Sequence, residues 1–319
     1  MTRKLARFSL AVLLGALLAA PLAAQAAVPS LDKAAKRAQT DVKVLAADEL
    51  GGRLTGTAGA DSAAAYVARR FAQVGLQPPP GGWFQPFTVS KDAPAVQHAN
   101  LGDLNGKNVI GILPGRDPVL RNETVIVGAH YDHLGLGGFG ALDPDSAGRV
   151  HNGADDNASG TAAPFAIAER LRAAPPARTV VFIAFSGEEL GLLGSDYYIK
   201  HPLYPLSATE IMINLDMVGR LKNDKLLVYG TGTATEIPAL LDPLHWHGKS
   251  DLRPQPEGYG PSDQTSFYAA KIPVLHFFTD LHGDYHRSSD DWDKINAQGL
   301  VRVADFAAAV GVVRASDAT

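Results

Sequence analysis

The amino-acid sequence predicts an α/β fold, a single domain with a mixed, mostly parallel β-sheet flanked by helices. Short apolar segments rich in β-branched residues alternate with longer segments whose apolar residues recur at helical spacing. This alternation is typical of parallel strands joined by helical crossovers. The 319 residues show no internal repeat, charge block or linker that would indicate a second folded domain.

The first 26 residues have the three parts of a secretory signal peptide. A basic start with Arg3, Lys4 and Arg7 precedes an apolar stretch over 8–20, and residues 24–26 match an A-x-A cleavage site. A membrane anchor is the weaker interpretation, because a spanning helix needs about 20 apolar residues. We therefore expect a signal peptide over 1–26, a folded domain over 27–319, and export to the periplasm or the extracellular space without stable membrane association after cleavage.

The first folded elements follow from local patterns. Residues 60–76 are predicted to form a helix, because apolar residues recur at helical spacing up to Phe71 and Gly75 ends the pattern. The segment 78–87 (PPPGGWFQPF) reads as a turn-rich connector. Two short β-branched runs that come next are predicted strands, at 108–113 and 124–130.

The rest of the chain continues the alternation. The glycine-rich span 134–150 is predicted to be a long irregular loop, a type of segment that often has a function. A short helix is expected to begin at Glu188 or Glu189. The remaining predictions are helices over 158–173, 235–246 and 298–314 and strands over 179–185, 210–215, 225–229 and 272–278.

Composition limits the chemistry. The formal net charge of −4 becomes −7 once the three basic residues of the signal peptide are removed, which argues against a nucleic-acid or anionic-membrane partner. The chain has no cysteine, so disulfides and thiolate metal sites are excluded. Any metal must be held by imidazole and carboxylate groups, which suits zinc, cobalt or manganese.

Polar residues with this chemistry lie where predicted strands end. His130, the doublet Glu188-Glu189 and Asp216 each come at or just after such an end. In open parallel sheets, ligands bind outside the carboxyl ends of the strands. These side chains are therefore expected to converge on one edge of the sheet.

Five short motifs then identify a resemblance. In chain order they are GAHYDHLG (128–135), HNGADDNASG (151–160), SGEELG (186–191), INLDMVGR (213–220) and DYHRSSDD (284–291). Over residues 45–296 the chain resembles the secreted two-zinc, leucyl-aminopeptidase-like metallopeptidases, which are related to glutaminyl cyclases and glutamate carboxypeptidase. The resemblance implies a zinc-exopeptidase fold, a zinc peptidase catalytic domain over 27–319 and a peptide substrate.

The resemblance also implies a ligand set for two zinc ions per chain, for which cobalt or manganese can substitute. His130 and Asp216 would hold one ion, Glu189 and His286 the other, and Asp156 would bridge both. Asp155 is the alternative bridge, but the offset to the Ala158-Ser159-Gly160 turn favours Asp156.

Three further residues are predicted to serve catalysis. Asp132 lies two residues after His130, on the same side of an extended chain, and is expected to accept the ring N–H of that histidine. Glu188 is the predicted general base, which takes a proton from the hydrolytic water and passes it to the departing amine. Tyr285 is expected either to stabilise the oxyanion or to be a packed wall residue.

The other histidines are given ordinary roles. We expect His133 and His151 to line the cleft, His276 to be buried and hydrogen-bonded, and His282 to lie near the last ligand. The remaining four are expected on the surface or in loops, at positions 98, 201, 245 and 247.

Gln264 and Ser288 depart from the pattern of the resembled family, where histidine and often proline stand, so they bear on specificity rather than on chemistry. The alternative functions are glutaminyl-peptide cyclisation, a two-metal amidohydrolase without the usual inserted domain, and a metal-free relative that binds partner proteins. The sequence leaves open the preferred side chain, aminopeptidase against dipeptidase or carboxypeptidase, the native metal and the oligomeric state.

Overall fold

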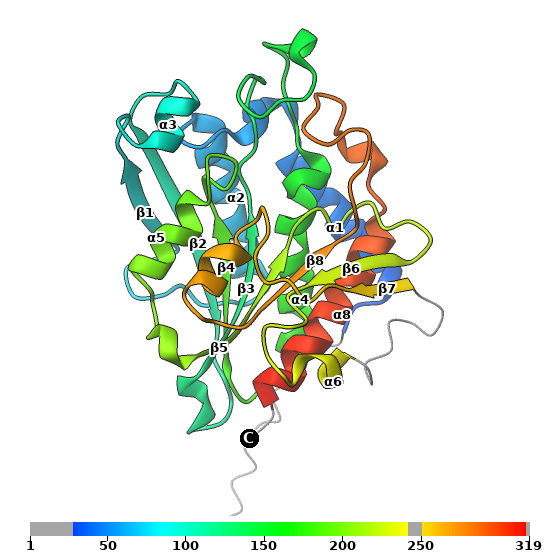
Figure 1. Cartoon of the computed structure of the whole chain (residues 1–319). Helices are drawn as coiled ribbons and strands as arrows, with labels where there is room; N and C mark the ends of the chain where they lie inside the picture. The colour runs from blue at the N-terminus through cyan, green and yellow to red at the C-terminus, as the bar shows by residue number, and fades with distance from the viewer. Residues whose placement is uncertain (1–27, 242–250, 317–319) are drawn as a thin grey trace, which may run out of the picture.

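A computed structural model of the chain describes residues 28–241 and 251–316, and within these ranges eight strands form one mixed sheet (Figure 1). The strands lie side by side in the order β1-β2-β4-β3-β5-β8-β6-β7. Their bounds are β1 Phe84–Val89, β2 Leu104–Leu113, β3 Thr124–His130, β4 Thr179–Phe185, β5 Thr209–Leu215, β6 Lys225–Tyr229, β7 Asp251–Pro254 and β8 Val274–Phe278.

The centre of the sheet is parallel and its flanks are mixed. β4, β3, β5 and β8 run in the same direction, whereas β1 pairs with β2, β2 with β4 and β6 with β8 in antiparallel fashion. Every residue of β3 and β4 is buried, as expected of parallel strands covered on both faces. The carboxyl ends of the four central strands therefore meet at one edge of the sheet.

Helices cover both faces of the sheet (Figure 1). On one face, α1 Leu31–Leu45, α2 Ala58–Gln73, α4 Gly160–Ala173 and α8 Ala297–Ser316 share a large apolar core with the sheet. On the other face, Tyr198 of α5 (Leu193–Lys200) and Phe267 of α7 (Gln264–Ala269) pack against a second core that includes Ile126. Full burial of a large apolar side chain contributes roughly 1.5–3 kcal/mol, so the two cores fix the sheet between its helices.

Short elements complete the described chain. The helices α3 and α6 span Pro94–His98 and Ile237–Leu241. Turns of 3₁₀-helix lie at Asp48–Arg53, Leu120–Asn122, Pro144–Ser146, Leu206–Ala208 and Trp292–Lys294, and Ala154–Ser159 form a π-type turn before α4. No helix among the described residues is long and apolar enough to cross a bilayer.

The structure confirms the predicted α/β class and corrects several elements. The connector predicted over 78–87 ends inside β1, and no sequence pattern predicted α1, α3, α7 or β7. The short helix predicted to begin at Glu188 or Glu189 is wrong, because residues 187–192 form a turn and α5 begins at Leu193. The glycines that flank the doublet, Gly187 and Gly191, have φ of 78° and 102°, which a helix does not allow.

Some predictions fall outside the described residues. The signal peptide predicted over 1–26 lies there, and so do His245, His247 and the second half of the helix predicted over 235–246.

Candidate metal centre

The ends of the central strands bring together the predicted ligands. His130 is the last residue of β3, Asp216 follows β5 directly, and Glu189 follows β4 after a short turn. Asp156 comes from the turn before α4, and His286 from the loop that follows β8. The edge where parallel strands end thus collects side chains that are up to 156 residues apart in the sequence.

Asp156 lies between two clusters of ligand atoms. Its Oδ1 is 3.4 Å from Nε2 of His130, and its Oδ2 is 3.1 Å from Nε2 of His286. The turn that presents it is held by Asp290, whose Oδ2 accepts the backbone N–H groups of Asp155 (2.8 Å) and Asp156 (3.1 Å). Gly153 is required here, because a Cβ at that position would lie 2.0 Å from the carbonyl oxygen of Asp156.

One cluster consists of His130, Asp156 and Asp216, whose ligand atoms all lie within 4.8 Å of one another. Oδ1 of Asp216 is 3.5 Å from Nε2 of His130, and Oδ2 accepts the hydroxyl of Ser262 at 2.7 Å. Oδ1 of Asp216 is buried and has no hydrogen-bond partner among the described residues. A buried carboxylate oxygen left in this way is an open ligand atom.

The other cluster is built around Glu189. Its Oε2 is 3.2 Å from Nε2 of His286, and its Oε1 is hydrogen-bonded at 2.6 Å to Nδ1 of His133. Ligand atoms of His133, Asp156 and Glu189 also lie within 4.8 Å of one another. His133 was expected only to line the cleft, but it contacts the proposed ligand Glu189 directly. Its position in the motif HYDH, three residues after His130, was the sequence feature that could have predicted this contact.

His286 is held in an unusual backbone conformation by the 134–150 loop. Its φ of 53° is in the left-handed region, which few residues other than glycine adopt. Its Nδ1 donates to the carbonyl oxygen of Gly140 at 2.8 Å, and its own carbonyl oxygen accepts the N–H of Leu142 at 2.8 Å. The irregular loop predicted from the glycines therefore positions a predicted metal ligand.

A carboxylate joins this loop to the segment after His286. Oδ2 of Asp143 accepts both the backbone N–H (2.9 Å) and the hydroxyl (2.8 Å) of Ser288, and its Oδ1 is 2.7 Å from Nε2 of the buried His151. A proline at position 288 has neither a backbone N–H nor a hydroxyl, so the departure at Ser288 creates both of its contacts with Asp143. We refer to Asp143, His151 and Ser288 as the Asp143 clamp.

Glu188 and Asp132 lie beside His130. Oε2 of Glu188 is 3.9 Å from Nε2 of His130, and the backbone N–H of Glu188 donates to Oδ1 of Asp132 at 3.2 Å. Nδ1 of His130 is 3.2 Å from the backbone oxygen of Asp132 and 3.7 Å from its Oδ1. The backbone oxygen, and not the carboxylate expected from the spacing, is thus the nearer acceptor.

The remaining candidates take separate places. The ring of Tyr285 stacks on His286, with ring centroids 3.9 Å apart. Asp155 is turned to other partners, since its Oδ2 is 3.0 Å from Nε2 of His282 and its Oδ1 accepts the N–H of Gly219 at 2.7 Å. His276 is buried as expected, but the expected hydrogen bond is missing at Nε2, which has no partner among the described residues.

Arg53 is fully buried beside the metal centre, and the sequence did not predict this role. Nε of Arg53 donates to the carbonyl oxygen of Tyr131, and its terminal nitrogens donate to those of Leu45, Asn152 and Gly153, at 2.5 to 3.0 Å. It therefore joins the end of α1, the residue after β3 and the turn that presents Asp156. Arginine in a Gly-Gly-Arg sequence offers no local signal for such a role.

Burial and crowding perturb the charges of the centre. Burial raises the pKa of Glu188 well above its usual range. The nearby charge of His130 acts in the opposite direction, whereas the carboxylates of Glu189 and Asp216 raise the pKa further. For Asp156 burial acts in the same direction, but hydrogen bonds from His130 and His286 outweigh it and hold the pKa well below its usual range. Buried like charges at such distances are costly unless a cation compensates them.

The donor set fits a divalent cation. It consists of imidazole nitrogens and carboxylate oxygens, which zinc accepts in a closed or partly open site. A cavity of about 400 Å³ adjoins the centre, and no lysine or arginine is among the described residues that line it. Among the described residues of the cavity wall, only histidines can therefore supply positive charge to the carboxylates in place of a metal ion.

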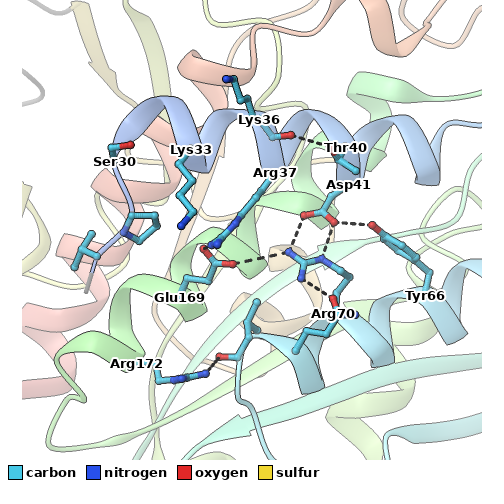
Figure 2. Close-up of a pocket in the computed structure, with 14 residues that line it drawn as sticks. Ser30, Lys33, Lys36, Arg37, Thr40, Asp41, Tyr66, Arg70, Glu169 and Arg172 are labelled. Atoms are coloured by element: carbon cyan, nitrogen blue, oxygen red, sulfur yellow. Dashed lines mark hydrogen bonds and ion pairs between the residues drawn. The ribbon is translucent and has the colours of Figure 1, made fainter. Parts of the chain in front are cut away.

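A larger cavity, of about 910 Å³, contains none of the predicted site residues (Figure 2). It lies among α1, α2 and α4, where Arg37 pairs with Glu169 at 2.8 Å and Arg70 pairs with Asp41 at 2.6 Å. These ion pairs join the three helices, so we assign this cavity to helix packing.

Comparison with known proteins agrees with the geometry. The family model for Peptidase family M28 matches residues 108–311, which include all the predicted ligands. Aminopeptidase YwaD of Bacillus subtilis is 39% identical over 114 residues, which are 35% of this chain and 22% of YwaD. Leupeptin-inactivating enzyme 1 of Streptomyces exfoliatus is 27% identical over 311 residues, which are 90% of this chain and 59% of that protein. The chain thus spans about a fifth to three fifths of these relatives.

Solved structures share the fold. A zinc aminopeptidase from Bacillus subtilis (BSAP) superposes with a TM-score of 0.72 at 20% identity, over 91% of this chain and 97% of that one. A glutaminyl cyclase from Bacteroides thetaiotaomicron superposes with a TM-score of 0.70 at 19% identity, over 91% and 100%. Since the family match extends over most of the described chain and contains the whole candidate centre, this chain belongs to Peptidase family M28.

Proposed function

We propose that this protein is an exported two-zinc exopeptidase that removes N-terminal residues from peptides. The observation that supports it most is the position of Asp156, whose two carboxylate oxygens face His130 on one side and His286 on the other. A carboxylate shared by two groups of ligands suits a pair of cations about 3.5–4 Å apart.

In this proposal five residues hold the metals. His130 and Asp216 would hold one zinc ion, Glu189 and His286 would hold the other, and Asp156 would contribute to both. When bound, zinc polarises the scissile carbonyl and lowers the pKa of water toward neutrality. We assign His133 to orienting Glu189, because Nδ1 of the histidine already lies at hydrogen-bond distance from Oε1.

Glu188 moves the proton. Its side chain is 11% exposed and lines the cavity with His130 and Asp216, and its Oε2 is 3.9 Å from Nε2 of His130. It takes a proton from the hydrolytic water and delivers it to the leaving amine. Tyr285 also lines the cavity, and we assign it to donating a hydrogen bond to the developing oxyanion.

The choice of an N-terminal exopeptidase has support from the printed names of relatives, among them Aminopeptidase YwaD and several leucine aminopeptidases. The glutaminyl cyclase among the structural neighbours shares the fold, so cyclisation of N-terminal glutamine is the alternative activity to assay. The pattern of residues 1–26 supports export, which N-terminal sequencing of the secreted protein would test.

The proposed activity is tested on purified protein treated with a chelator and then given zinc. We expect no hydrolysis of leucyl-anilide by the metal-free protein, recovery after zinc is added, and no hydrolysis when the α-amine of the substrate is acetylated. The absence of zinc-dependent release from a broad panel of aminoacyl-anilides would contradict the proposal. Formation of pyroglutamate from glutaminyl peptides in its place would favour the cyclase.

A further inference from the structure

Outside the metal centre, much of the cavity wall is apolar and aromatic. Around the cavity of about 400 Å³, the side chains outside the proposed metal and proton-transfer groups include Met217, Tyr229, Tyr259, Phe278 and Leu281. Such a wall suits the side chain of the N-terminal residue of a substrate. Among the other described residues of the wall, His276 carries an imidazole ring and Glu257 carries a charge.

His276 is a buried polar group without a partner. It lies in β8 beside Asn214 of β5, the residue is 7% exposed, and its ring packs against the rings of Tyr229 and Phe278 at centroid distances of 5.8 Å. Nε2 has no hydrogen-bond partner among the described residues. Burial lowers the pKa of His276 to about 4, so the ring is neutral at neutral pH. A buried polar atom of this kind gains free energy when a ligand bonds to it.

Glu257 is a charge without compensation. The residue is exposed at the cavity, and no described residue forms a hydrogen bond or an ion pair with its side chain. No lysine or arginine is among the described residues of the wall. In the proposed enzyme, zinc compensates the carboxylates of the metal centre, so the negative charge of Glu257 remains for the substrate.

We propose that this wall selects peptides whose N-terminal residue has a cationic side chain, lysine or arginine. The aliphatic stem packs on the aromatic rings, the charged end pairs with Glu257, and His276 accepts a hydrogen bond from it. Aromatic faces also attract a cation directly. The inference depends on the proposed function and adds the class of substrate that its cavity accepts.

The test compares two anilides that differ in one charged group. Lysyl- and norleucyl-anilide have stems of similar length, but only the first ends in an ammonium group. We expect the wild-type protein to have a higher kcat/KM for the lysyl substrate. In Glu257→Gln, the lysyl-to-norleucyl ratio of kcat/KM should fall about fivefold. This change corresponds to the loss of an exposed ion pair that contributes roughly 1 kcal/mol. The matched control Glu236→Gln, an exposed glutamate outside the cavity wall, should leave the ratio unchanged.

The outcomes separate the inference from the proposed function. Hydrolysis of norleucyl-anilide without a preference for lysine would overturn the inference alone. An equal fall in kcat/KM for both substrates in Glu257→Gln would also overturn the inference. Such a result would mean that Glu257 binds the α-ammonium group, which both substrates have. A lack of zinc-dependent hydrolysis of either substrate would overturn the proposed function itself.

Two more readouts address the mechanism of selection. The lysyl-to-norleucyl ratio should fall as salt is raised, because the charge of Glu257 is exposed and is screened. His276→Phe keeps an aromatic ring in the wall without ring nitrogens, and should lower kcat/KM more for the lysyl than for the norleucyl substrate. An unchanged ratio in both experiments would overturn the assignment of these two residues.

Discussion

Glu188 and Glu189 are neighbours in the sequence with different surroundings in the structure. Glu189 is bonded to His133 and His286, whereas the carboxylate of Glu188 approaches only His130 among these histidines, at 3.9 Å. Ligand atoms of His130, Glu188 and Glu189 still lie within 4.8 Å of one another, so the two carboxylates are neighbours that differ in their hydrogen-bond partners. One glutamate is therefore available for the metal and the other for the proton.

We predict that Glu188→Ala keeps its metal and loses turnover. The change removes proton transfer without removing a proposed ligand, so kcat should fall roughly 10²- to 10⁴-fold, the usual contribution of a general base. Zinc content and kcat measured on the same preparation check this. The double variant of His245 and His247 to alanine should keep both values, and near-normal kcat in Glu188→Ala would refute the assignment of the base.

At the scale of single residues, sequence patterns identified the strand-end ligands but not their supports. His130 and Asp216 belong to short motifs beside predicted strands, so their convergence could be inferred. Asp290 holds the Asp156 turn from 134 residues away through backbone N–H groups, and a contact of that kind leaves no local signal. The partner of Nδ1 in His130 also depended on backbone geometry that spacing alone did not define.

At the scale of elements, the 134–150 loop is part of the metal centre. Through Gly140 and Leu142 it holds His286 in the left-handed conformation, and through the Asp143 clamp it holds the segment that follows. The glycine content of the loop predicted irregular structure correctly. The contacts with the segment after β8 could not be predicted, because they join parts of the chain that are 145 to 146 residues apart.

We predict that Asp143→Ala weakens zinc binding about tenfold, without changing a proposed ligand. Removal of the clamp frees the segment that presents His286, and residues that orient a ligand typically contribute 10- to 100-fold to metal affinity. Competition with a chelator of known affinity measures the change. Asp145→Ala is the matched control, since Asp145 is an exposed aspartate of the same loop. Equal effects in the two variants would contradict a specific role for the clamp.

At the scale of the whole molecule, the parallel centre of the sheet explains why the site could be predicted before its geometry was known. Buried β-branched runs indicated strands such as β3 and β4, and parallel strands bring their carboxyl ends to one edge. The antiparallel flanks were less predictable. β1 follows a proline- and glycine-rich segment that reads as a turn, and β7 has only four residues, so neither offers a strong local pattern.

The zinc content of the purified protein is the sharpest test of a two-metal centre. After saturation with zinc and removal of the excess, elemental analysis should give two ions per chain for the wild type and one for Asp216→Ala, which removes a ligand of one site only. One ion or none in a correctly folded wild-type protein would contradict the account, because Asp156 would then have no second metal to bridge.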